Sequence, residues 1–131
     1  MSLRSLLQAG ASTLMGLALL PAASSATLLY VASYSGTVTT LNLTIPSGSP
    51  SLRSVASSPG CGSDPSWLTL DKATSTLYCL NEGRSSPNGS LASFGTNLSG
   101  SLTLKSSVTT PDGPVSAVIY GKGGSGIALA E

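Results

Sequence analysis

Few side chains in this sequence can do acid-base chemistry, and two of them stand together. Glu82 and Arg84 follow the apolar run TLYCL, and Asp64 comes just before the run PSWLTL. A carboxylate can activate water as a general base, and an arginine can hold an anion by a bidentate contact. Glu82 and Arg84 are therefore the candidate catalytic residues, with Asp64 third. Each also fits an exposed loop charge, which is the commoner situation of a charged residue.

An antiparallel strand pair would bring these residues to one end of a sheet. If 66–70 is one strand and 76–82 returns beside it, the second strand ends next to the start of the first. Loops at that end are the better place for a binding site, while Asp71 and Lys72 fall at the opposite end. The predicted substrate-binding residues are Asp64, Ser66, Asn81 and, in the same neighbourhood one repeat later, Ser116.

Several kinds of chemistry are excluded by composition. The chain has no histidine, so it cannot assemble a Ser-His-Asp triad or a histidine-based zinc site. We expect no metal and no cofactor. Only 8% of the residues are charged, and without Arg4 the basic and acidic side chains balance. Nucleic-acid binding and an amphipathic membrane-surface helix therefore have no electrostatic support.

Residues 1–26 have the pattern of a secretory signal peptide. Arg4 precedes an apolar stretch, and Ser24 and Ala26 are small residues at a plausible cleavage site. The alternative, an uncleaved anchor, is disfavoured because Gln8 and Gly10 leave the stretch short of the ~20 apolar residues that a spanning helix needs. The sequence thus predicts a secreted, extracellular protein with no membrane segment after cleavage. Three glycosylation sequons agree with this, although a Ser/Thr-rich chain also produces them by chance: Asn42, Asn88 and Asn97.

Two cysteines in a secreted chain raise the question of a disulfide. Simple pairing of the strands places Trp67 opposite Cys79 and leaves Cys61 ~20 Å away along the extended chain. A disulfide needs Cα atoms within about 7 Å. Unless the glycines of PGCGSDP fold the loop back, we expect Cys79 to be a buried free thiol.

An internal repeat predicts the architecture. Beyond the leader the chain consists of strands and turns, and the motifs around Tyr30, Ser51 and Pro65 recur about 49 residues later. Four short strands per repeat is typical of a propeller blade, and blades packed face to face explain strands that are apolar on both faces. The predicted strands are 27–34, 37–43, 52–57, 66–70, 76–82, 90–95, 101–110 and 115–120.

The predicted fold class is therefore all-β, with residues 27–131 forming about two four-stranded blades of a β-propeller and the start of a third. Propellers close with roughly four to eight blades, so we expect a fragment, a truncated gene model or a product of gene decay. The alternative is a small autonomous β-sandwich, which would leave the repeat unexplained.

The ordered series DPSWLTLDKATSTLYCLNEG, NGSLASF, GSLTLKSSVTT and GPVSAVIYG resembles the fungal lactonase family, from about Leu28 to Glu131. These are seven-bladed propellers similar to 6-phosphogluconolactonase and carboxymuconate cyclase. The resemblance implies that the chain starts on the second strand of a blade, that PSWLTL and PVSAVIY line the channel, and that further blades of the same propeller are its partners. It also implies a small-molecule lactone or organic acid as substrate.

Two functions from different classes follow. The first is a lactonase in which Glu82 activates water and Arg84 holds an anionic substrate; we expect this chain to be inactive by itself, because the remaining blades are absent. The second is a secreted propeller that serves only as a scaffold or binding module, since a fold does not fix a function.

Overall fold

The computed structural model describes residues 27–131, so the predicted leader lies outside the described residues. Within that range the regular structure consists of strands, joined by turns, and one short 3-10 helix, η1 (Pro46–Gly48). The strands are β1 (Thr27–Ser33), β2 (Thr37–Thr44), β3 (Ser51–Pro59), β4 (Pro65–Asp71), β5 (Thr76–Asn81), β6 (Gly89–Thr96), β7 (Leu102–Thr110), β8 (Ser116–Tyr120) and β9 (Gly126–Ala130).

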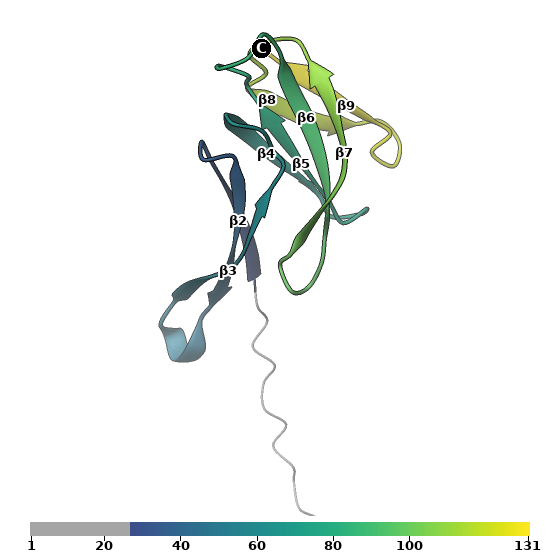
Figure 1. Ribbon diagram of the computed structural model, residues 1–131. Coiled ribbons are helices and arrows are strands. Elements are labelled where there is room, and N and C mark those ends of the chain that lie inside the picture. The colour runs from purple at the N-terminus through teal and green to yellow at the C-terminus, as the bar shows by residue number, and fades with distance from the viewer. Residues whose placement is uncertain (1–26) are drawn as a thin grey trace, which may run out of the picture.

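The strands form three antiparallel sheets that follow one another along the chain (Figure 1). Sheet A has the order β1-β2-β3, sheet B the order β4-β5-β6-β7, and sheet C contains β8 and β9. Strand β4 contacts β1 on one side and β8 on the other, so the three sheets lie side by side. The predicted all-β fold is confirmed, and each predicted strand corresponds to an observed one within a few residues.

The core lies between sheets A and B. Strand β5 is buried along nearly its whole length, and its Leu77 and Cys79 side chains share the core cluster with Val38 of sheet A. Phe94 and Leu77 are the largest buried side chains of the core, and each contributes about 1.5–3 kcal/mol through burial. The buried core cluster is Val38, Cys61, Leu77, Cys79, Ala92 and Phe94.

Hydroxyl groups connect neighbouring sheets. Between sheets A and B, Thr40 Oγ1 donates a buried 2.7 Å hydrogen bond to the Gly100 carbonyl in the β6–β7 turn. Between sheets B and C, Ser66 Oγ donates to the Pro114 carbonyl at 2.8 Å and Thr69 Oγ1 to the Ala117 carbonyl at 3.2 Å. These bonds hold each sheet in register with the next.

The expectation of a free Cys79 is wrong: Cys61 and Cys79 form a disulfide, with Cα atoms 5.7 Å apart. The loop does fold back, because Gly60 and Gly62 have φ values of 109° and 98°, a region that favours glycine. The expected pairing of Trp67 with Cys79 is also wrong, since a β-bulge between Pro65 and Trp67 shifts the register by one. Leu68 faces Cys79, and Trp67 faces Leu80.

Candidate functional site

The end of sheet B where β4 begins and β5 ends brings three chain segments together; we call it the Glu82 end. The Glu82 amide donates to the Asp64 carbonyl at 2.9 Å, and the Gly113 amide donates to the Glu82 carbonyl at 3.0 Å. The loop before β4, the loop after β5 and the loop before β8 therefore meet at this end. As the sequence predicted, the carboxyl-bearing residues Asp64 and Glu82 lie beside one another.

Glu82 and Arg84 form the only ion pair found within residues 27–131. Arg84 Nε lies 3.7 Å from Glu82 Oε2, and the side chains are 67% and 18% exposed, respectively. Because Arg84 is largely in water, this pair contributes at most about 1 kcal/mol to stability. The guanidinium thus stands beside a partly sheltered carboxylate, and both groups can still reach a ligand.

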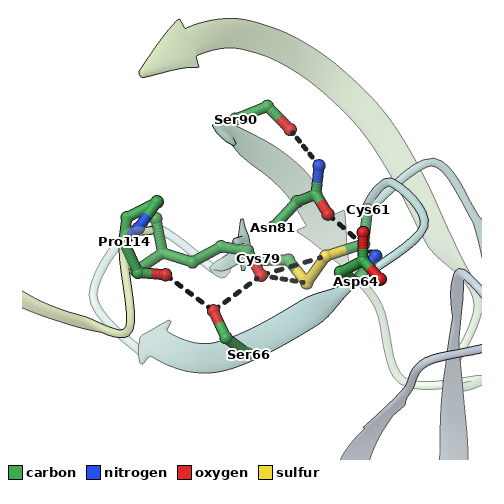
Figure 2. The surroundings of a disulfide bond; sticks show 8 residues. Cys61, Asp64, Ser66, Cys79, Asn81, Ser90 and Pro114 are labelled. Carbon is green, nitrogen blue, oxygen red and sulfur yellow. Dashed lines mark hydrogen bonds between the residues drawn. A yellow bond between two sulfur atoms is a disulfide. The ribbon is translucent and has the colours of Figure 1, made fainter. Parts of the chain in front are cut away.

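Asn81, one of the predicted binding residues, is buried beneath this end and bound to the protein itself. Its Oδ1 accepts a 2.8 Å hydrogen bond from the Asp64 amide, and its Nδ2 donates to Ser90 Oγ at 3.3 Å (Figure 2). The side chain thereby connects the loop before β4 to β6. Asn81 lies at the predicted end, where it positions Asp64.

Ser66 and Ser116 are both half-buried at the same end. Figure 2 shows the Ser66 side chain pointing toward Pro114, and its hydroxyl donates a hydrogen bond to the Pro114 carbonyl. Ser116 is the first residue of β8 and pairs with Ala130 of β9. The Asp64 carboxylate accepts a 2.7 Å hydrogen bond from Ser63 Oγ. Among the charged groups of the predicted site residues, those of Glu82 and Arg84 contact one another, whereas the Asp64 carboxylate is bound by the neighbouring Ser63 hydroxyl.

Sequence reasoning did not anticipate the groove between β1 and β4. This open groove has a volume of about 340 Å³ and is lined by residues 30–32 and 65–68. Trp67, the single tryptophan, is 44% exposed within it. The single tryptophan, Trp67, is the one residue whose presence could have indicated this groove from the sequence.

The opposite end of sheet B, which we call the Asp71 end, carries a different carboxylate. Hydrogen bonds from the Thr74 hydroxyl and from the Ala73 amide lower the pKa of Asp71 below its ordinary value of 3.8. These partners all belong to the β4–β5 turn. Asp71 is therefore a turn-stabilising residue.

Neither a metal centre nor a membrane-spanning helix is found in the part of the chain that the structure describes. No three His, Cys, Asp or Glu side chains come together there as potential metal ligands. No helix of residues 27–131 is long and apolar enough to cross a membrane.

The three sheets are antiparallel meanders, and the first strand of each, β1, β4 and β8, contacts the first strand of the next sheet. This arrangement defines the chain as part of a β-propeller. The family model "Lactonase, 7-bladed beta-propeller" matches residues 28–131, and the chain belongs to this lactonase family. Its general type of function is accordingly that of a lactonase. No curated protein and no solved structure shows significant similarity to the chain.

Proposed function

We propose that the protein is a secreted lactonase-type propeller acting on the internal ester of a sugar acid or a related organic acid. The family match over residues 28–131 is the observation that carries this proposal. Secretion is supported by the signal-peptide pattern of residues 1–26 and by the buried Cys61–Cys79 disulfide, because disulfides persist in oxidising compartments. A secreted enzyme would meet unphosphorylated acids, since phosphorylated sugars are intracellular.

In this proposal Glu82 is the general base. Its carboxylate takes a proton from water, and the resulting hydroxide bonds to the lactone carbonyl carbon. The ring C–O bond then breaks, and the released alkoxide takes the proton back from Glu82 to give the hydroxy acid. Arg84, within 3.7 Å of Glu82, holds the anionic group of the substrate or product.

The proposal also includes further blades of the same propeller as partners. The outer face of sheet C exposes Val118 and Tyr120 by 60% and 58%, and a hollow of about 270 Å³ is lined by residues 116–118 and 128–130. Exposed apolar surface of this kind marks an interaction site. Because this chain supplies no histidine and few charged groups, we infer that the 131-residue protein alone does not turn over lactones.

Lactone hydrolysis by two proteins tests the proposal. The first is the 131-residue chain, and the second is a complete seven-bladed ring that carries residues 27–131 as its first blades. Aldonolactones and a lactone that carries a free carboxylate are supplied as substrates, and acid release is followed in a pH-stat. We expect turnover by the ring only, with kcat reduced by Glu82→Gln and, for the carboxylate-bearing lactone, KM raised by Arg84→Ala. Turnover by the short chain would overturn the inferred inactivity, and a ring variant Glu82→Gln with full kcat would overturn the role of Glu82.

A scaffold without enzymatic activity is the second candidate. It is favoured by Asn81 and Ser66, whose polar atoms are engaged in holding the sheets together. A complete ring that binds an organic acid but hydrolyses none of the lactones would support this second function.

A further inference from the structure

The three sequons lie in very different surroundings. Asn97 is exposed in the turn between β6 and β7, Asn88 is exposed in the loop before β6, and Asn42 lies within β2. We propose that Asn97 carries an N-linked glycan in the secreted protein and that Asn42 remains unmodified. This inference rests on the proposed secretion.

The turn at Asn97 is made by local contacts alone. The Gly100 amide donates to the Asn97 carbonyl at 3.1 Å, and Asn97 Oδ1 accepts hydrogen bonds from the Ser99 amide at 3.0 Å and the Ser99 hydroxyl at 2.6 Å. A turn of this kind can form in the nascent chain, before the sheets assemble. The bonds use Oδ1, and within residues 27–131 the amide nitrogen Nδ2 has no partner. The atom that receives the sugar is thus presented to solvent.

The surroundings of Asn97 leave room for a bulky group. Leu98, the next residue, is fully exposed at 101%, so the turn projects from the surface. Thr96 is hydrogen-bonded through its amide to the Ser75 carbonyl, which places the turn at the Asp71 end of sheet B. A glycan at Asn97 would therefore shield Leu98 from other molecules without covering Glu82 and Arg84.

Asn42 offers no such room. It pairs with Leu28 of β1 and Arg53 of β3, in the middle of sheet A. By strand alternation its side chain lies on the same face as Val38 and Thr40, which are completely buried against sheet B. Its Oδ1 is itself buried without a hydrogen-bond partner in the described residues. Asn42 is half-buried, and a glycan there would stand against the neighbouring strands of sheet A, so we expect this sequon to remain unmodified.

The modification is a group transfer that needs a glycan donor from the secretory pathway. Asn97 Nδ2 forms a bond to C1 of the first sugar and loses a proton to a base of the transferase. The C1–O bond to a lipid-linked diphosphate breaks, and the diphosphate leaves with the electron pair. No oxidation or reduction takes place.

Secretion of the full chain from yeast cells, in an Asn88→Gln background, tests this assignment. Intact-mass spectra before and after peptide N-glycosidase count the glycans, and a peptide map identifies Asn97 by its conversion to Asp. We expect a single glycan that is lost in Asn97→Gln and in Ser99→Ala. It should be retained in Asn42→Gln and in the control Ser101→Ala, since Ser101 contacts Ser99 but lies outside the sequon.

A second version separates this inference from the proposal of secretion. It carries a proven yeast leader directly before Thr27, so that it reaches the secretory pathway in any case. A glycan at Asn97 in this version but not with the native leader would refute secretion and support the assignment. A version with the yeast leader that lacks a glycan at Asn97, or that carries one at Asn42, would overturn the assignment.

Discussion

Cys61 and Cys79 are joined across 18 positions of sequence by a disulfide in which neither residue is exposed to solvent. The bond fastens the loop before β4 to the central strand β5, two residues before Asn81. Through Asn81 and its hydrogen bond to the Asp64 amide, the same region shapes the Glu82 end. The disulfide thus connects the core between sheets A and B with the candidate site.

The double substitution Cys61→Ala/Cys79→Ala should lower the free energy of unfolding by about 3 kcal/mol. A loop of this length gains that much conformational freedom in the unfolded chain when the cross-link is removed. Urea unfolding of the oxidised protein, the reduced protein and the double variant measures the effect. The reduced protein and the double variant should have similar free energies of unfolding, both lower than that of the oxidised protein. If both were as stable as the oxidised protein, the disulfide would not contribute to stability.

Gly62→Ala should destabilise the protein by more than Gly48→Ala does. Both glycines have φ in the left-handed region, at 98° and 84°, so each alanine variant carries backbone strain of about 1 kcal/mol. An added Cβ at Gly62 would also lie 2.5 Å from Asn81 Cγ, whereas nothing lies within 4 Å of one at Gly48. We expect an additional loss of about 1–3 kcal/mol for Gly62→Ala.

Urea unfolding of the two alanine variants gives the comparison, and a nuclear magnetic resonance spectrum of the Asp64 amide reports whether Asn81 has moved. Equal stability of the two variants would show that Asn81 does not restrict this position.

The sequence was sufficient to predict the strands and their grouping, because alternating apolar runs and a repeat encode them directly. It was insufficient at Cys61, where two residues in the left-handed region reverse the chain. Glycine permits this conformation but also many others, so its presence alone does not say which one is adopted. The bulge at Ser66 was missed for a similar reason, since a one-residue shift in pairing has no clear sequence signal.

Thr40→Val should lower the free energy of unfolding by about 1–3 kcal/mol. Valine has nearly the shape of threonine, but it leaves the buried Gly100 carbonyl without the 2.7 Å hydrogen bond from Oγ1. The control is Thr39→Val, on the opposite face of β2, which should change stability by less than about 0.5 kcal/mol. Thermal and urea unfolding of both variants measure this difference. Two equal values would show that the bond does not hold sheets A and B together.

The candidate site was predictable in position but not in the state of its residues. Strand order was enough to place Asp64, Asn81 and Glu82 at one end of sheet B. The sequence could not show that Asn81 would turn inward and bind the Asp64 amide, because that depends on the close approach of Gly62. It also gave no distance between Glu82 and Arg84, which is a property of the loop conformation.

Asp71 should contribute to stability in a pH-dependent way, because hydrogen bonds from Thr74 and Ala73 lower its pKa in the folded protein. A carboxylate with a lowered folded pKa stabilises the protein above its unfolded pKa, here about 3.8. This contribution declines as the pH falls through the folded pKa, which lies below 3.8. Wild-type protein should therefore exceed Asp71→Ala in stability at pH 6, and the difference should shrink in strong acid.

The titration of the Asp71 carboxyl carbon, followed by nuclear magnetic resonance, measures the pKa directly. Thr74→Val removes the 2.6 Å hydrogen bond that is the largest cause of the shift, so the midpoint should rise toward 3.8 in this variant. Thr96→Val, at the same end of sheet B but without a hydrogen bond to Asp71, is the control and should leave the midpoint unchanged. A wild-type midpoint at or above 3.8 would contradict the stabilising role of this turn.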